Sequence, residues 1–425
     1  MATVKIPYAK RMIKLELPEE RLFGVLTSKA HDYVPEAGET DLVRGALAHP
    51  IHSSRLSELA KDKKNIVIIC SDHTRPVPSK IIMPVVLEEI RSTNPDANIT
   101  LLIATGFHRA TTKEELIDKF GEKIVNEENI VMHDSRKQEE MVNIGKLPSG
   151  GDILLNKVAV EADLLISEGF IEPHFFAGFS GGRKSVLPGV VSEVTVLANH
   201  CSKFIASKNA RAGILEDNPI HIDMLSAAKQ AKLAFIVNVV IDADKKVIKA
   251  FAGDLVKAHE EGCAFVSELA TVDAKPADIV ITSNGGYPLD QNIYQTVKGM
   301  SAAEATCKKG GVIIICSACN DGHGGEAFYD WFANASGPQE ILDKIMAIDA
   351  CSTIADQWEA QILARIQLKH EVIIVSDQCD HKLIEKMHMR AAASLEEALA
   401  MAEQLVGNDV KITVIPDGVS VIVKG

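Results

Sequence analysis

The sequence contains no apolar run of about 20 residues, the length that a membrane-spanning helix requires. It also lacks an apolar segment of signal length at its start, which reads Met-Ala-Thr-Val-Lys-Ile-Pro-Tyr. Positive charge is in deficit, because the formal net charge is −13. This acidity argues against nucleic acid and against an anionic membrane as partners. We therefore expect a soluble, cytoplasmic protein.

The cysteines lack the spacing of a disulfide framework or of a complete zinc site. Eight of them are scattered over 425 residues, which favours reduced thiols. Cys316 and Cys319 have the Cys-x-x-Cys spacing of redox and zinc motifs, but no second pair supplies the other two zinc ligands. We interpret this pair as a packed strand end, with a redox or metal role as the alternative.

Length and hydrophobic pattern predict two α/β domains. The chain is too long for one typical core, and short apolar runs alternate with helix-compatible segments in both halves. We expect mainly parallel sheets flanked by helices, with the active site in the cleft between an N-terminal domain at 1–270 and a C-terminal domain at 278–425, joined by a linker at 271–277. Strands are expected at 3–17 (a pair), 65–70, 98–104, 163–167, 233–241, 246–251, 278–283, 311–316, 371–376 and 411–415, and helices at 53–61, 79–91, 255–269 and 395–405.

Three predicted strands of the first half end in residues that are suited to chemistry. Asp72 and Arg75 follow the first, His108 follows the second, and His174 follows the third. Because ligands bind beyond the carboxyl ends of strands in parallel α/β sheets, we expect these side chains to converge. For most of the fourteen histidines we expect only a hydrogen-bonded core or surface position. His323 lies in a glycine-rich setting, and we assign it no role.

A glycine-rich loop, Gly178–Ser185, follows the third of these strands. Such a loop can offer backbone N–H groups to an anion. It departs from the phosphate-binding P-loop because Arg183 separates Gly182 from Lys184 and the glycine spacing is one residue short. A glycine turn with a solvated Arg–Lys pair is the alternative. The helix-compatible segment that follows places His200 near its far end.

Four blocks of sequence carry a resemblance to a known family. They are GFIEPHFFAGFSGGRKSVLPG, Ser71–Ser79, Thr105–Arg109 and Gly285–Gly299. Together they resemble the nickel-pincer lactate racemase family over essentially the whole chain. The resemblance implies a racemase that interconverts D- and L-lactate by reversible hydride transfer, with a pyruvate intermediate. It also implies nickel and a pyridinium-3,5-bisthiocarboxylic acid mononucleotide that depends on cofactor-maturation proteins.

The resemblance implies roles for four residues around the cofactor. Lys184 would carry the nucleotide through a thioamide, and His200 would be the protein ligand to nickel. His108 and His174 would be the two catalytic bases. Two bases are needed because the enantiomers present their hydroxyl groups on different sides, and imidazole can exchange protons near neutral pH. Cys201 is a rival nickel ligand, but neighbouring side chains on a helix diverge.

Further residues would hold the cofactor and the substrate. By resemblance, the turn with Asp72, His73, Thr74 and Arg75 would contact the cofactor. Asp72 could hold a ribose hydroxyl group, or orient His108 or Arg75.

The second domain would contribute to substrate binding. Gln295 and Lys298 share one helix face and would bind the substrate carboxylate together with Arg75. Trp358 would form a wall of the pocket or belong to the core.

Three alternatives to a lactate racemase stay open from the sequence. The first is a racemase or epimerase that acts on another 2-hydroxy acid with the same cofactor. The second is a hydrolase in which His108, His174 and His200 bind zinc or nickel directly. The third is a non-catalytic protein that binds a nucleotide phosphate at the glycine-rich loop.

Overall fold

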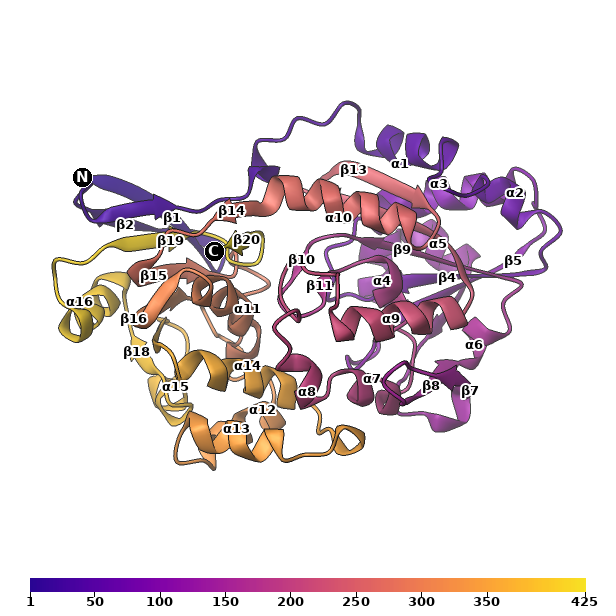
Figure 1. Cartoon of the computed structure of the whole chain (residues 1–425). Helices are drawn as coiled ribbons and strands as arrows, with labels where there is room; N and C mark the ends of the chain where they lie inside the picture. The colour runs from indigo at the N-terminus through magenta and orange to yellow at the C-terminus, as the bar shows by residue number, and fades with distance from the viewer.

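The computed structural model describes residues 1–425, which form two α/β bodies side by side (Figure 1). The sheet of the first body has the order β13 (Val247–Gly253), β12 (Leu233–Ile241), β9 (Leu164–Phe170), β4 (Asn65–Ser71), β5 (Asn98–Ala104) and β6 (Asn129–Met132). The sheet of the second has the order β18 (Arg390–Ala392), β17 (Glu371–Val375), β16 (Cys307–Cys316), β15 (Ala277–Ser283), β19 (Ile412–Ile415) and β3 (Leu22–Val25). All neighbours are parallel except β12 and β13, which confirms the predicted fold class.

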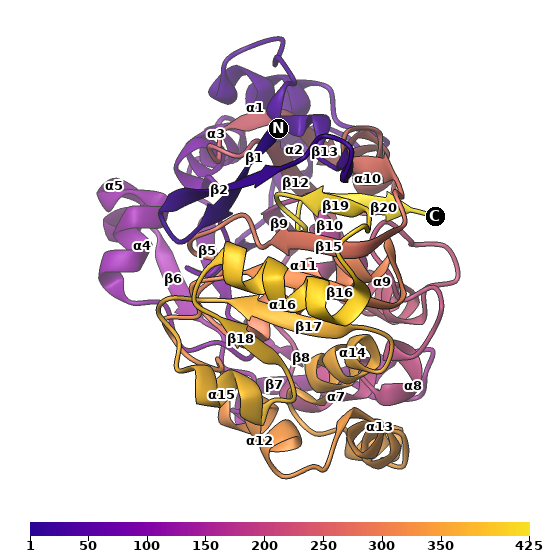
Figure 2. The ribbon, with the colours of Figure 1, turned by 90° about the vertical axis from the view of Figure 1, so that its left-hand side faces the viewer.

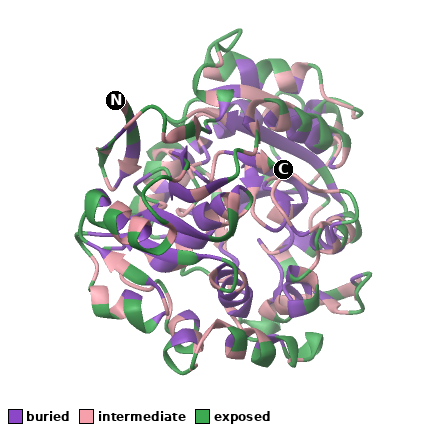
Figure 3. Ribbon diagram, turned by 60° about the vertical axis from the view of Figure 1, so that its left-hand side comes forward, coloured by how far each residue is buried: buried purple, intermediate pink, exposed green.

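The central strands are continuously apolar because both faces of each sheet are covered. In β4, Ile66 and Ile68 pack into one core, whereas Val67 and Ile69 pack into the core on the other face. Successive side chains of a strand point to opposite faces, so a strand between two helical layers needs apolar residues throughout. Buried residues therefore concentrate along the sheets, with exposed residues on the outer helices and loops (Figure 3).

Helices of ordinary length cover these faces. In the first body, α1 (Glu39–Ala48) and α3 (Ser79–Arg91) pack on one face of the sheet. In the second, α16 (Leu395–Val406) crosses one face, as Figure 2 shows, and α11 (Ile293–Glu304) lies on the other. The structure has no helix with both the length and the apolar character needed to cross a membrane.

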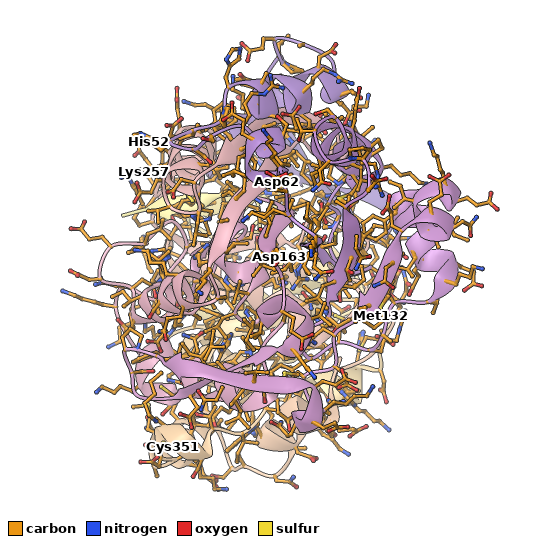
Figure 4. All side chains as sticks on the ribbon, turned by 90° about the vertical axis from the view of Figure 1, so that its right-hand side faces the viewer. His52, Asp62, Met132, Asp163, Lys257 and Cys351 are labelled. Atoms are coloured by element: carbon orange, nitrogen blue, oxygen red, sulfur yellow. The ribbon has the colours of Figure 1, made fainter.

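The strands of the first sheet are aligned at their amino ends by a carboxylate. Asp163, labelled in Figure 4, immediately precedes β9, and its Oδ2 accepts hydrogen bonds from the backbone N–H groups of Lys64 and Asn65 at 3.0 and 2.8 Å. The start of β9 is thereby held beside the start of β4. Because the strands are parallel, their carboxyl ends also emerge together, at the opposite edge of the sheet.

The first residues of the chain pack with the second body, although the sequence analysis placed them in the domain at 1–270. They form the expected hairpin, β1 (Ala2–Tyr8) paired with β2 (Arg11–Leu17). The next strand, β3, pairs with β19 at the edge of the second sheet. Ile6 and Leu17 share a core with Ile281 and Ile314 of that sheet. The start of the first domain at residue 1 stays a prediction, although these contacts tie the first residues to the second sheet. A short strand carries no local signal for which distant sheet edge it joins.

The predicted linker at 271–277 contains ordered structure. Within it, β14 (Thr271–Asp273) pairs in parallel with β20 (Ile422–Lys424), so the C-terminus returns to the junction of the two bodies (Figure 1). The chain thus crosses between the bodies as a strand with a partner. A boundary between independent folding units at this point stays a prediction.

The packing of the hairpin predicts which part of the protein is destabilised when a hairpin side chain is truncated. Ile6→Ala should destabilise the second body by about 2–5 kcal/mol, because Ile6 is fully buried and the change leaves a cavity. Native-state hydrogen exchange should show faster opening of β15 and β19, with β4 unchanged. Met12→Ala, at a 60% exposed position of the same hairpin, is the control. Loss of protection in β4 in place of β15 would contradict this assignment.

Candidate active site

A cavity of about 550 Å³ lies between the two bodies. Arg75, His174 and Lys184 of the first body line it, and Lys298 lines it from the second. Arg75 and His174 follow the carboxyl ends of β4 and β9, as the sequence analysis expected from a parallel sheet. The structure therefore brings residues from distant parts of the chain together around one space.

Asp72 holds His108 in a defined orientation. His108 Nδ1 lies 2.7 Å from Asp72 Oδ2, while the N–H and the hydroxyl group of Thr74 donate to Asp72 Oδ1 at 3.1 and 2.7 Å. An ionised carboxylate only accepts hydrogen bonds, so the proton of His108 resides on Nδ1 and Nε2 is left as the acceptor. Of the roles considered for Asp72, this contact supports the orientation of His108.

Asp72 stays ionised although it is buried. Burial alone favours the neutral acid, but the hydrogen bond and charge of His108, together with the charge of Arg75, outweigh it and lower the pKa of Asp72 to about 2. A permanent negative charge therefore lies beneath the imidazole of His108. This charge would stabilise the imidazolium that forms when His108 accepts a proton.

Lys184 is held as a neutral amine next to His174. Its Nζ lies 3.3 Å from His174 Nε2, and His174 Nδ1 accepts a hydrogen bond from the N–H of Ala177 at 3.2 Å. Because Nδ1 acts as an acceptor, the proton of a neutral imidazole lies on Nε2. The amine of Lys184 therefore accepts a hydrogen bond from His174 Nε2. Burial, and then the charges of Arg183 and Arg75, lower the pKa of Lys184 well below its usual range. A neutral amine is the nucleophilic form of lysine.

His174 is neutral for the same reasons. Burial lowers the pKa of its imidazole well below the ordinary value, and the surrounding cations lower it further. These cations are Lys184, Lys298, Arg75 and Arg183. Unlike His108, His174 makes no hydrogen bond to a carboxylate.

The glycine-rich loop separates its two basic residues. Lys184 faces the cavity, whereas Arg183 is only 1% exposed, so the alternative of a solvated Arg–Lys pair is wrong. The loop starts at β11 (Gly178–Phe179) and runs into a single 3-10 turn at Gly182–Ser185. No long helix begins at this loop, so it has neither the sequence nor the geometry of a P-loop.

His200 is a neutral imidazole with one free nitrogen. It follows α7 (Glu193–Asn199), and its Nδ1 donates to Val196 O at 3.1 Å, which leaves Nε2 without a hydrogen bond. Burial, and then the charge of Lys184, lower the pKa of His200 to about 3. The adjacent Cys201 precedes α8 (Ser202–Ile205), and burial raises the pKa of its thiol, which disfavours the thiolate that binds metals.

The side chains alone do not make a metal site. No three His, Cys, Asp or Glu residues lie close enough to hold a metal ion. The alternative in which His108, His174 and His200 coordinate a metal directly is therefore wrong. A metal at His200 would take its other ligands from a bound group.

The second body contributes a basic residue and an aromatic wall. On α11, Lys298 Nζ donates to Gln295 Oε1 at 2.5 Å, so the two residues act from one helix face, as their spacing predicted. On α14 (Gln357–Gln367), the ring of Trp358 lies 4.9 Å from His200, and its Nε1 donates to the hydroxyl group of Tyr294 at 3.2 Å. Trp358 is therefore both a core residue and a neighbour of His200.

Two buried acids near the cavity were missed by the sequence analysis. Glu172 lines the cavity, and burial raises the pKa of its carboxyl group, against the charges of Lys298 and Arg75. Glu359 on α14 is also buried, with its pKa raised by burial and Lys298 as its opposing charge. Glu172 belongs to one of the sequence blocks that carried the resemblance, so its position in that block could have marked it as a candidate site residue. Nothing in the sequence distinguished Glu359.

Other singled-out residues lie outside the cavity wall. His73 Nδ1 bonds to the hydroxyl group of Thr111 at 3.1 Å, so its contact with a cofactor stays a prediction. His323 Nδ1 accepts from the N–H of Gly325, and its ring stacks on Tyr329. The strand-end interpretation of Cys316 and Cys319 is confirmed, because both are free thiols buried at and just beyond the end of β16.

Both bodies match models of one protein family. A model of the lactate racemase N-terminal domain matches residues 8–213, and a model of the lactate racemase C-terminal domain matches residues 272–423. The chain belongs to the lactate racemase family. Lactate racemases from Thermoanaerobacterium thermosaccharolyticum and Lactiplantibacillus plantarum are 60% and 57% identical over 424 residues, and each alignment covers 100% of both chains.

Solved structures agree with the assignment to the lactate racemase family. The structure of the lactate racemase apoprotein from Thermoanaerobacterium thermosaccharolyticum superposes with a TM-score of 0.97 at 60% identity over the whole of both chains. A crystal structure of a Thermotoga maritima protein has a TM-score of 0.68 at 18% identity and covers 92% of this chain. This second likeness shows the fold alone.

The buried Asp72 predicts a pH-dependent contribution to stability. Its folded-state pKa of about 2 lies below the ordinary 3.8, so the ionised group stabilises the fold above pH 3.8 and the effect disappears as the pH falls toward 2. Asp72→Asn should lower the free energy of unfolding near pH 7 by about 2 kcal/mol. Urea unfolding at a series of pH values should show this difference shrinking in acid. A difference that is constant with pH would contradict the assignment.

Proposed function

We propose that this chain interconverts D- and L-lactate with a nickel-pincer nucleotide bound to Lys184. The observation that carries the proposal is the full-length similarity to two lactate racemases. The cavity supports it, because the amine of Lys184, the imidazole of His174 and the cations of Arg75 and Lys298 line one space. Racemisation or epimerisation of another 2-hydroxy acid on the same residues is the alternative, and assays across lactate, malate and longer 2-hydroxy acids distinguish the two.

The residues present fit such a cofactor. Lys184 is a neutral amine at the cavity wall, which is the form that a covalent linkage requires. His200 offers one free imidazole nitrogen and no companion ligands, which suits a nickel ion that already has donors from the nucleotide. When bound, the group would supply an electrophilic ring carbon that accepts and returns hydride.

The substrate carboxylate would lie between the two bodies. Arg75 from the first body and Lys298 from the second line the same cavity, and both can bind a carboxylate by charge-assisted hydrogen bonds. Gln295 holds the ammonium of Lys298 and would add a further polar contact. Because binding uses groups from both bodies, the substrate would also hold them together and limit access of water to the keto acid.

The hydroxyl proton would be exchanged by His108 with one enantiomer and by His174 with the other. His108 already presents Nε2 as an acceptor, with Asp72 behind it. His174 Nε2 lies 3.3 Å from the amine of Lys184. A thioamide nitrogen is a poor acceptor, so linkage of Lys184 would release His174 Nε2 toward the substrate. To accept the hydroxyl proton at Nε2, His174 would hold its own proton on Nδ1 and would give up the hydrogen bond from Ala177.

Deuterium at the α-carbon of lactate tests the reaction class. Racemisation of α-deuterated L-lactate in ordinary water should give D-lactate that keeps the label, because a transferred hydride does not exchange with solvent. Mass spectrometry of the product measures the retained label, and Lys184→Arg is the control without an anchor. Complete loss of the label to water would show abstraction of a proton from carbon and would overturn the hydride route.

Single replacement of each histidine tests the pair of bases. His108→Ala and His174→Ala should each slow racemisation by about 10²- to 10⁴-fold, the usual contribution of a positioned acid–base group. Chiral chromatography should follow both directions, with intact mass as the measure of cofactor loading in each variant. Unchanged rates in both fully loaded variants would remove the two bases from the mechanism.

A further inference from the structure

Arg183 is the largest fully buried side chain of the protein, and it has no carboxylate partner. Its guanidinium instead donates to carbonyl groups of its own loop. Nη2 donates to Ala177 O at 2.7 Å, and Nη1 donates to Gly181 O at 3.2 Å and to Ser180 O at 3.4 Å. A buried cation is costly unless it is hydrogen-bonded, and these carbonyl groups pair with both terminal nitrogens of the guanidinium, while Nε has no partner.

His259 holds the same loop from a different element. It lies on α10 (Lys257–Ala270) and is 3% exposed. Its Nε2 is 2.8 Å from Ser180 O and 3.1 Å from Arg183 Nη1. One ring nitrogen serves one of these partners at a time, by donating to the carbonyl or by accepting from the guanidinium. In either tautomer, the same atom ties α10 to the loop.

The loop is also enclosed on its other sides. The N–H of Gly182 donates to Asn238 Oδ1 at 2.7 Å, and a Cβ added to Gly182 would lie 2.8 Å from the ring of His259. Gly182 has φ of +52°, a conformation that favours glycine. The backbone therefore passes between Asn238 on β12 and His259 on α10 with no room for a side chain.

One carbonyl connects these contacts to the residue at the cavity. Gly181 O accepts from Arg183 Nη1 and also from the backbone N–H of Lys184, at 3.1 Å. Arg183 thus holds the backbone of Lys184 through Gly181, while the two side chains point to opposite sides of the loop. Neither Arg183 nor His259 needs to touch substrate for this effect.

We propose that Arg183 and His259 form a clamp that positions Lys184 for attachment of the cofactor. The clamp comprises the guanidinium, the imidazole and the carbonyl groups of Ala177, Ser180 and Gly181. The role in attachment rests on the proposed function of Lys184.

Two substitutions of one residue test the clamp. His259→Phe keeps an aromatic ring but cannot form either hydrogen bond, whereas His259→Gln places an amide near the position of Nε2 and can form one of them. In the unloaded protein, backbone amides of 177–186 should exchange about tenfold faster in His259→Phe, since an unpaired buried partner costs about this factor. His259→Gln should stay within about twofold of the parent protein.

A matched control lies in the same region. His221 faces a second cavity that Arg183 and His259 also line, but its ring makes no hydrogen bond to the loop. His221→Phe should leave exchange of 177–186 within about twofold of the parent, as expected for a change without a lost contact. Arg183→Lys is the second test of the clamp. A lysine keeps the charge but loses the fork that spans Ala177 and Gly181, so exchange should rise.

Intact mass after co-expression with the cofactor-building proteins gives the second readout. The fraction of loaded Lys184 should fall in His259→Phe and be restored in His259→Gln. Parent-like exchange in both His259→Phe and Arg183→Lys would overturn the clamp. A fully active parent with unmodified Lys184 would instead overturn the anchor, and the difference in exchange between His259→Phe and His259→Gln would still show the clamp.

Discussion

The arrangement of the site depends on positive charges that lie close together at and beside one cavity. Arg183, Arg75 and Lys298 all lower the pKa of Lys184, and of the acids only Glu172 opposes them there. Burial in such surroundings disfavours every added positive charge. The amine of Lys184 and the imidazoles of His174 and His200 are therefore held neutral, in the forms that react with an electrophile or bind a metal. The nearby positive charges, together with burial, thus keep several residues in their neutral forms.

His108 differs from these residues in its surroundings, because a carboxylate lies beside it. Asp72 lies against its Nδ1 and stays ionised despite burial. The two histidines that we propose as bases therefore differ in their surroundings, since one has a carboxylate behind it and the other faces only cations. Each base would exchange the hydroxyl proton of one enantiomer. Because their surroundings differ, the two proton transfers would differ from each other.

The fold places these groups by two separate means. Parallel strands deliver Arg75, His108 and His174 to one edge of the first sheet, which needs only the regular geometry of the α/β fold. Lys184 is instead placed by an irregular loop, which has no ladder of backbone hydrogen bonds to keep its shape. The buried guanidinium of Arg183 and the imidazole of His259 provide contacts that a regular element would supply through its own backbone. The second body then closes the cavity with Lys298, and its Trp358 packs beside His200.

The sequence by itself determined the central strands of both sheets, the parallel α/β class and the shared sheet edge of Arg75, His108 and His174, because apolar runs and strand ends are local signals. It missed the short strands β3, β6 and β18. Its blocks were also specific enough to indicate the family. Only the tertiary structure decided that the N-terminal hairpin packs on the second sheet and β3 joins its edge, that Arg183 is buried while Lys184 faces the cavity, and that Glu172 and Glu359 lie near Lys298. These outcomes depend on contacts between residues far apart in the chain. The periodicity and spacing of residues within one segment do not show which distant residues will bury a given side chain.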